Sequence, residues 1–344
     1  MRPHVVPLLR CPACRSDGPL SLATSIDREG EILEGTLRCD TCSGSFPITD
    51  GIARLLGSCS EVASKERAVY RRSREEVEKR IGLLPPEHKD EELRRIAFME
   101  HTGDDFRLTS TLNLDGALRG VDPHPGEWLV ELGAGSGWLT SRWATRGLRC
   151  IAMDLSPDLK LELSPLVMRQ EGVYFDRLMG DMTNIPLRSG AVRWVFVSAS
   201  LHHAEGLAAS LAEAARVLEP GGSLVAINEP MHGIFRRSGK RFVDQVARDN
   251  PGLNEQSFSY LQWRHALRVA GLRPRFLFPP YYRAVLERRI RAPRTSGGFA
   301  ALAAALWRSP LRHAVRLPWV MASAQLLLGL NVCMIARKES SRGQ

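Results

Sequence analysis

The 344-residue chain lacks the features of an exported or membrane-spanning protein. Its first residues contain no continuous apolar segment, because prolines, His4 and Arg10 interrupt it, so we expect a cytoplasmic protein. The apolar stretch 320–336 is interrupted by polar residues such as Gln325. It therefore predicts a helix followed by a strand rather than a spanning helix.

Internal repeats and low-complexity segments are also lacking, and cysteines number only seven. In a reducing compartment these cysteines do not imply disulfides. Hydrophobic residues make up 44% of the chain, which is ordinary for a globular protein with a sizeable core. The length allows one large domain with a small one, or two of middling size.

Acidic residues are in the minority, with 38 against 47 basic ones and a formal net charge of +9. The imbalance is concentrated between residues 271 and 316, where ten arginines face one acid, Glu287. This composition favours an anionic partner, although a solvated basic face would look the same.

Two Cys-x-x-Cys pairs, Cys11 with Cys14 and Cys39 with Cys42, are separated by 24 residues. Four thiolates in this pattern match a tetrahedral structural zinc site. About fifty residues bury little core, whereas zinc binding by finger-sized peptides contributes about 10–16 kcal/mol, so metal can fold this segment. A redox pair would explain only one of the two motifs. The sequence predicts structural Zn²⁺ in a domain of residues 1–57.

The surroundings of these cysteines resemble the small zinc-ribbon proteins that bind and activate methyltransferases. The matching segments are Leu8-Leu9-Arg10, Gly35-Thr36-Leu37-Arg38 and residues 46–56. Such ribbons act with enzymes that modify transfer RNA, ribosomal RNA and translation factors. The resemblance implies a stabilising or substrate-positioning module fused ahead of its catalytic partner. Cys59, Cys150 and Cys333 lie outside the pairs, and we expect core or incidental thiols there.

A glycine-rich segment, Glu-Leu-Gly-Ala-Gly-Ser-Gly at residues 131–137, follows an apolar run and precedes an expected helix. Its glycines allow positive φ angles and close approach of a ligand. A carboxylate, Asp154, ends the next apolar run, where it could accept hydrogen bonds from two ribose hydroxyls. A dinucleotide fingerprint would need glycine or alanine where Trp138 stands, so dinucleotide binding is disfavoured.

This segment resembles motif I of the class I S-adenosylmethionine-dependent methyltransferases, and the resemblance continues over about a hundred residues. It includes Gly180-Asp181-Met182, Ile185-Pro186-Leu187, the expected strand 194–198, His202-His203 and the segment from Arg216 to Gly222. The resemblance implies cofactor-binding roles for Glu131, Gly133, Gly135, Gly137, Asp154, Leu155, Asp181, Met182 and Ser198. Glu131 would lie near the cofactor's amino group, Asp154 on the ribose, and Leu155, Asp181 and Met182 around the adenine.

Methyl transfer is an in-line displacement, so positioning contributes most, and a base helps only when the nucleophile carries a proton. His202 and His203 follow the fourth strand, where the methyl group should emerge, and imidazole has a suitable pKa. Helix capping or packing is the alternative role for this pair. His232 is a further candidate. The chain lacks the Asn/Asp-Pro-Pro-Tyr motif of related enzymes that methylate planar amino groups, which disfavours that subclass.

Apolar segments alternate between strand and helix character across residues 120–344, which predicts an α/β fold with a doubly wound, mainly parallel, seven-stranded sheet. Expected elements include a helix from Leu207 that ends at Pro220-Gly221-Gly222, a helix starting after Ser156, and strands at 223–228, 273–278 and 331–336. Residues 58–119 are highly charged and predict exposed helices broken at Pro85-Pro86, serving as a linker or as an arm over the cofactor.

An insertion of residues 281–320 separates the last two expected strands and combines arginines with Trp307, Trp319 and leucines. This composition is typical of a helix at an anionic membrane surface, but a substrate lid or a packed helix would also fit. Peripheral membrane contact is therefore one expectation.

The leading functional hypothesis is O- or N-methylation of a small-molecule, glycan or lipid-linked intermediate. The zinc ribbon and the basic insertion support an RNA methyltransferase as the alternative, although the tryptophans are dispersed among apolar residues instead of forming a stacking surface. A catalytically silent binding module is the alternative of another class. The oligomeric state is open.

Overall fold

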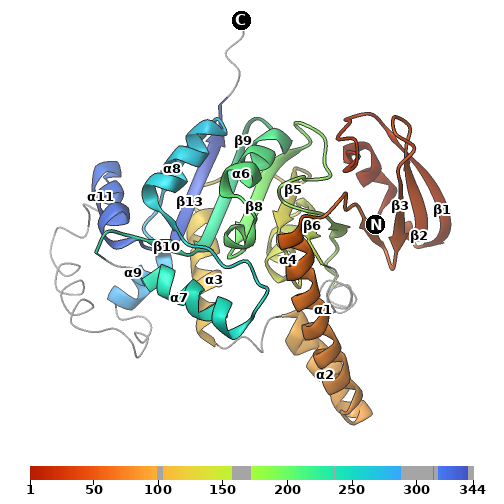
Figure 1. Ribbon diagram of the computed structural model, residues 1–344, viewed down its shortest axis with the longest axis horizontal. Helices are drawn as coiled ribbons and strands as arrows, with labels where there is room; N and C mark the ends of the chain where they lie inside the picture. The colour runs from red at the N-terminus through yellow and green to blue at the C-terminus, as the bar shows by residue number, and fades with distance from the viewer. Residues whose placement is uncertain (99–103, 157–171, 236–237, 288–312, 314–316, 340–344) are drawn as a thin grey trace, which may run out of the picture.

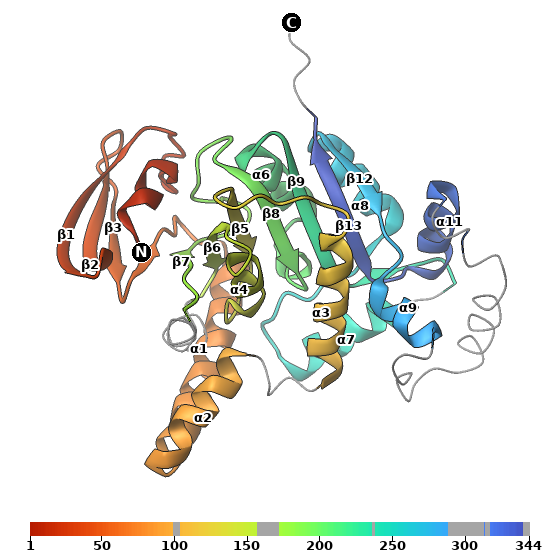
Figure 2. The ribbon, with the colours of Figure 1, turned by 180° about the vertical axis from the view of Figure 1, so that it is seen from behind.

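The computed structural model describes residues 1–98, 104–156, 172–235, 238–287, 313 and 317–339. Its main feature is one sheet of eleven strands, flanked by helices on both faces (Figures 1 and 2). None of the described helices is long and apolar enough to cross a membrane.

Seven strands of this sheet form a doubly wound core. In spatial order they are β7 (Asp176–Met179), β6 (Arg149–Asp154), β5 (Trp128–Leu132), β8 (Val192–Ser198), β9 (Leu218–Glu229), β13 (Val332–Lys338) and β12 (Leu272–Phe276). The strands from β7 to β9 are parallel, and β13 runs antiparallel to both of its neighbours. Strand order reverses between β5 and β8, which places a crevice at the carboxyl ends of these strands. The expected seven-stranded, mainly parallel sheet is confirmed.

The N-terminal segment extends this sheet, which the sequence did not predict. Strands β1 (Leu20–Arg28), β2 (Glu31–Cys39), β3 (Ser45–Thr49) and β4 (Ile52–Arg54) form an antiparallel series preceded by the short helix η1 (Pro3–Leu8). Strand β4 then pairs in parallel with β7, with Ile52 opposite Arg177. The small domain therefore covers an edge of the large sheet that would otherwise be open.

Two hydrophobic cores lie on the opposite faces of the sheet, because side chains alternate along each strand. In β5, Val130 and Leu132 belong to one core and Leu129 to the other. Helices α6 (Leu207–Val217) and α8 (Tyr260–Val269) cover the first face, and α3 (Asp104–Leu118) and α4 (Trp138–Ala144) the second (Figures 1 and 2). This is the layer order of a doubly wound fold.

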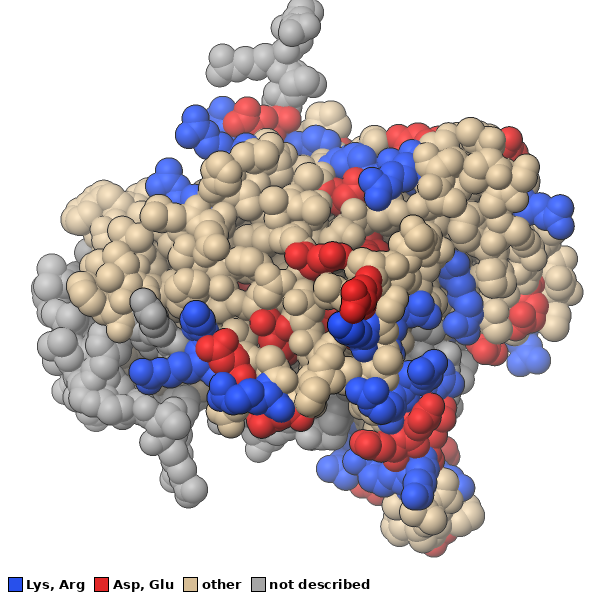
Figure 3. Space-filling model, viewed as in Figure 1, with Lys and Arg blue, Asp and Glu red and all other residues tan. Residues whose placement is uncertain are grey.

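The charged segment 58–119 forms two mainly exposed helices, as expected, but its third described helix, α3, packs on the sheet and is not exposed. Helix α1 (Glu61–Gly82) is capped by Ser60, and α2 (Pro86–Ala97) begins with proline at its first position. The pair projects from the body, and Figure 3 shows basic and acidic side chains interspersed over it. Ion pairs such as Arg74 with Glu78 and Arg80 with Glu92 account for this mixture. The start of α1 lies against the body (Figure 1), and Ala97 at the end of α2 belongs to the second hydrophobic core.

Several expected boundaries differ from the structure. Helix α6 ends at Val217, and the Pro-Gly-Gly segment expected to end it lies inside β9, because Leu218 already pairs with Val192. The stretch 320–336 divides into α11 (Pro318–Leu328) and β13, as predicted. The helix expected after Ser156 and most of the insertion 281–320 lie outside the described residues. The remaining helices are α7 (Ser238–Asp249) and α9 (Pro280–Leu286), and β10 (Met231–His232) pairs with β11 (Phe258–Ser259).

Candidate cofactor pocket and metal centre

The four predicted zinc ligands come together in the N-terminal domain. All four sulfur atoms, from Cys11, Cys14, Cys39 and Cys42, lie within 4.8 Å of one another. The Sγ atoms of Cys11 and Cys42 are 3.7 Å apart, as are those of Cys14 and Cys39. Zn–S bonds of about 2.3 Å at tetrahedral angles separate two sulfurs by about 3.8 Å, so this donor set fits zinc.

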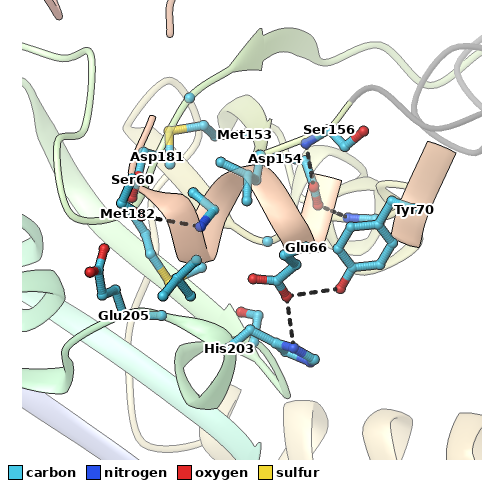
Figure 4. Close-up of a pocket in the computed structure, with 18 of the residues that line it drawn as sticks. Ser60, Glu66, Tyr70, Met153, Asp154, Ser156, Asp181, Met182, His203 and Glu205 are labelled. Carbon is cyan, nitrogen blue, oxygen red and sulfur yellow. Dashed lines mark hydrogen bonds and ion pairs between the residues drawn. The ribbon is translucent and has the colours of Figure 1, made fainter. Parts of the chain in front are cut away.

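A pocket of about 170 Å³ opens at the carboxyl ends of β6, β5 and β8 (Figure 4). Its walls come from the glycine loop, the ends of β6 and β7, the turn after β8 and the first turns of α1. Of the residues predicted to bind cofactor, Gly133, Gly135, Asp154, Leu155, Asp181 and Met182 line it. This is the position at which a doubly wound sheet binds a ligand.

The glycine loop has left-handed backbone at three positions, with φ of 70° at Gly133, 54° at Gly135 and 71° at Gly137. A Cβ atom at Gly133 would lie 2.4 Å from that of Ser200, and one at Gly137 would lie 2.5 Å from the ring of Phe175. A Cβ at Gly135 would meet no atom of the described residues within 4 Å, although this residue lines the pocket. Gly135 therefore leaves open space that a ligand can fill, whereas its two neighbours serve packing.

This contrast predicts different outcomes for two alanine variants. Gly135→Ala should fold with only a modest loss, because left-handed backbone costs an alanine about 1 kcal/mol, but it should weaken S-adenosylhomocysteine binding by at least about tenfold. Gly133→Ala should instead lower thermal stability strongly, because its Cβ collides with Ser200. Calorimetric titration and thermal unfolding of both proteins check this. Equal cofactor affinity in Gly135→Ala and wild type would contradict the assignment.

The two strand-end carboxylates already organise the backbone around the pocket. Asp154 accepts hydrogen bonds from the N–H groups of Gly135, at 2.9 Å, and Ser156, at 3.2 Å. Asp181 accepts from both the backbone N–H and the hydroxyl of Thr183, at 2.7 Å each. Figure 4 shows Asp154 at one end of the pocket and His203 at the other. The pocket thus has an acidic end at β6 and β7 and an imidazole end at the turn after β8.

Glu131 lies outside the lining of this pocket. Its carboxylate is buried and accepts a hydrogen bond from the hydroxyl of Thr140. Burial raises the pKa of Glu131 to about 8, and the nearby charge of Asp154 adds to the rise. The side chain is consequently protonated in the folded protein at neutral pH.

The raised pKa predicts a pH-dependent effect of Glu131→Gln. A folded-state pKa above the ordinary 4.5 means that the folded protein loses stability as pH rises from about 4.5 to about 8. The amide of the variant cannot ionise, so its free energy of unfolding should exceed that of wild type increasingly over this range. The difference should reach about 2–4 kcal/mol near pH 8 and vanish at acid pH. Denaturant unfolding at several pH values measures the difference.

Glu127→Gln provides the opposite control. Partial burial opposes ionisation of Glu127, but hydrogen bonds from the Trp194 indole and the His124 N–H lower its pKa overall. This variant should be less stable than wild type above about pH 4.5, where the wild-type carboxylate is ionised, and the difference should disappear as pH falls below 4.5. A Glu131→Gln variant with the same pH profile as wild type would show that Glu131 is not held protonated.

Four further candidate residues also lie outside the pocket lining. Gly137 is the N-cap of α4 and packs on Phe175, and the Ser198 hydroxyl accepts a hydrogen bond from the amide of Asn228 at 3.1 Å. His202 is buried behind its neighbour, so His203 alone of the histidine pair lines the pocket. His232 is not in the lining and contacts the Ser257 hydroxyl at 3.1 Å.

The structure adds pocket residues that the sequence did not indicate. Helix α1 contributes Glu66 and Tyr70, and the turn after β8 contributes Ser200. The Nδ1 atom of His203 lies 2.9 Å from Glu66, in an ion pair that joins the turn to the helix (Figure 4). Burial opposes protonation of His203, but the contact with Glu66 raises its pKa overall. The start of the charged segment is therefore a wall of the pocket, whereas periodicity alone left an arm and a linker equally open.

Two family models match the chain, a Trm112p-like protein over residues 3–51 and a methyltransferase domain over residues 130–226. Similar curated proteins include a malonyl-[acyl-carrier protein] O-methyltransferase from Serratia marcescens, 37% identical over 102 residues. That alignment covers 30% of this chain and 38% of the relative. The corresponding protein of Yersinia pestis is 29% identical over 203 residues, covering 57% of this chain and 73% of the relative.

A demethylmenaquinone methyltransferase from Beutenbergia cavernae is 26% identical over 169 residues, covering 45% of this chain and 67% of the relative. Among solved structures, the complex of the Haloferax volcanii Trm112 methyltransferase activator with a methyltransferase aligns with a TM-score of 0.46 at 18% identity. It covers 72% of this chain and 98% of that one.

The matched domains coincide with the two parts described above. The Trm112p-like match contains all four clustered cysteines, and the methyltransferase match contains the glycine loop, both strand-end carboxylates and the histidine pair. The chain therefore contains a methyltransferase domain at residues 130–226, preceded by a Trm112p-like domain at residues 3–51 whose four clustered cysteines could hold zinc.

Proposed function

We propose that this protein transfers a methyl group from S-adenosylmethionine to oxygen or nitrogen of a small-molecule, glycan or lipid-linked biosynthetic intermediate. The observation that carries the proposal is the pocket itself, in which a left-handed glycine at position 135 leaves ligand-sized space between Asp154 and Asp181. The described residues of the pocket thus fit an adenosine-containing cofactor at the acidic end.

Each wall of the pocket then has a role. Asp154 would accept hydrogen bonds from the ribose hydroxyls, and Asp181 with the Met182 backbone would bind the adenine, against which Leu155 packs. Gly133 and Gly135 would leave room for the ribose and methionine parts. The cofactor supplies an activated methyl group, and the protein contributes mainly by aligning the acceptor with it. We expect the acceptor at the opposite end, near Ser200 and His203.

The acceptor class is supported by the curated relatives, which methylate malonyl-[acyl-carrier protein] and demethylmenaquinone by name. Helix α1 also contributes Val62, Ala63, Glu66 and Tyr70 to the pocket lining. A pocket of about 170 Å³ favours a small acceptor or the end of a longer carrier-linked one over a folded macromolecule. RNA remains the second candidate on the ground of the zinc-ribbon domain, and a catalytically silent module remains the alternative of another class.

Methyl transfer from radiolabelled cofactor into fractionated cell extract, with and without nuclease, tests this proposal. We expect label in the small-molecule or organic-soluble fraction, unaffected by nuclease. Label that is lost on ribonuclease treatment would favour the RNA alternative. Absence of S-adenosylhomocysteine binding by folded, zinc-loaded protein would favour the silent module.

A further inference from the structure

A second cluster of metal-ligating side chains lies directly behind the imidazole end of the pocket. His202, His203 and Glu255 each offer one ligand atom, and these atoms lie within 4.8 Å of one another. Glu255 comes from the segment between α7 and β11, far along the chain from the histidine pair. Its side chain is only 4% exposed. None of these features follows from the zinc-ribbon site, which uses thiolates alone.

The segment that carries Glu255 is fixed opposite the histidines by hydrogen bonds on both sides. The Asn254 amide donates to the carbonyl oxygens of His203, at 2.8 Å, and Ala204, at 3.0 Å. The Gln256 backbone N–H donates to the carbonyl of His202 at 3.1 Å. These contacts hold the backbone on both sides of Glu255 against the backbone of the histidine pair.

A carboxylate orients each imidazole from its other nitrogen. The Nδ1 atom of His202 lies 2.9 Å from Glu229, and the Nδ1 atom of His203 lies 2.9 Å from Glu66. The carboxylate of Glu229 also accepts hydrogen bonds from the N–H groups of Ser200, at 2.8 Å, and Leu201, at 3.1 Å. A carboxylate can only accept when it is ionised, so Nδ1 of a neutral His202 is then the donor in this contact. Carboxylates in this position are typical of histidines that bind metal through Nε2.

The Nε2 atoms of both histidines face the carboxylate of Glu255, and a positive charge between the nitrogens and this carboxylate would stabilise the arrangement. Nε2 of a neutral His202 is an acceptor, yet it lies 3.4 Å from Oε2 of Glu255, and Nε2 of His203 lies 3.7 Å from Oε1. Oε2 of Glu255 is buried and accepts no hydrogen bond from the described residues. Two acceptors at this distance repel unless a proton or a cation lies between them.

The charge balance allows a divalent cation. Glu66, Glu229 and Glu255 carry −3 together when ionised, and either one divalent cation or protonation of both histidines leaves −1. Across the described part of the chain, no lysine or arginine forms an ion pair with any of the three. Metal–nitrogen and metal–oxygen bonds of about 2.1 Å at tetrahedral angles separate ligand atoms by about 3.4 Å, close to the two distances observed.

We propose that His202, His203 and Glu255 bind one divalent transition-metal ion beside the cofactor pocket, with Glu229 and Glu66 orienting the imidazoles. Two histidines and one carboxylate leave coordination positions free. Because His203 also lines the pocket, this site lies where we place the acceptor. The ion would hold an acceptor that presents a hydroxyl or carboxylate oxygen and would lower the pKa of a bound hydroxyl. This last role rests on the proposed function, whereas metal binding does not.

Titration of the zinc-loaded, full-length protein with Mn²⁺ tests the site. Electron paramagnetic resonance measures the free Mn²⁺ at each step. Mn²⁺ prefers nitrogen and oxygen ligands, so the thiolate site does not compete for it. We expect about one bound Mn²⁺ per chain, with affinity reduced at least about tenfold in Glu255→Gln and in His203→Gln. Glu205→Gln is the matched control, because Glu205 is an exposed pocket carboxylate outside the cluster.

The result can be separated from that of the proposed function by titrating S-adenosylhomocysteine in the same preparations. Retained cofactor binding without Mn²⁺ uptake by wild type would overturn the metal site and leave the methyltransferase proposal standing. Unchanged Mn²⁺ affinity in both cluster variants would also overturn it. Mn²⁺ uptake that is lost in both variants, in protein that binds no cofactor, would support the site and contradict the proposed function.

Discussion

Replacing Asp154 by alanine is expected to weaken S-adenosylhomocysteine binding by more than about a hundredfold. Hydrogen bonds to a charged group contribute about 1.5–3 kcal/mol each, and two ribose hydroxyls would lose theirs. Each 1.4 kcal/mol corresponds to about a tenfold change in affinity. The variant also removes the acceptor for the Gly135 N–H, so the glycine loop loses one of its anchors. Isothermal titration calorimetry measures the change.

Two further variants separate ligand contact from loop anchoring. Asp154→Asn keeps one oxygen acceptor for the Gly135 N–H but loses the negative charge, so its affinity should fall between wild type and Asp154→Ala. Asp122→Ala should bind normally, because the Asp122 side chain is 93% exposed and distant from the pocket lining. Wild-type affinity in Asp154→Ala, or tighter binding of NAD than of S-adenosylhomocysteine, would contradict the assignment of the cofactor.

Removing the metal from the four-cysteine cluster should unfold the N-terminal domain before the rest of the protein. Zinc contributes about 10–16 kcal/mol to the folding of finger-sized domains, which is more than so small a core can replace. Elemental analysis should find about one zinc in the thiolate site, and Cys39→Ser should lose it. Cys59→Ser is the control, because Cys59 lies outside the cluster. A metal-free preparation whose N-terminal domain is equally stable would contradict the prediction.

Removing the zinc should also affect the cofactor pocket, because the two domains share a sheet and several hydrogen bonds. Strand β4 pairs with β7, and the Asn184 amide donates to the carbonyl of Pro12 at 2.8 Å. Asn184 in turn bridges to Asp181 at the adenine end of the pocket. We therefore expect chelation to lower both the unfolding temperature of the catalytic domain and its affinity for S-adenosylhomocysteine. Unchanged cofactor affinity after the N-terminal domain has unfolded would show that the contact is only structural.

The sequence by itself determined the architecture of the catalytic domain and the composition of the thiolate site. Local patterns carry this information: apolar runs of strand length ending in a glycine loop or an aspartate, and two Cys-x-x-Cys pairs at ribbon spacing. Asp154 and Asp181 could be assigned to one crevice because parallel strands end at the same edge of a sheet. Gly135 lies in the glycine-rich segment that follows one of these strands, so it could be assigned to the same crevice.

Only the tertiary structure decided which residues share a site when no local pattern connects them. Glu66 lies on a helix whose charge pattern indicated only solvent exposure, and Glu255 lies in a segment without any motif, yet both contact the histidine pair. Such contacts depend on how α1 and the segment before β11 pack on the sheet, and packing is set by many distant residues at once. The pairing of β4 with β7 is likewise non-local, since a free sheet edge can accept any strand of compatible twist. Burial, which keeps Glu131 protonated and His202 out of the pocket, exists only after the chain has folded around them.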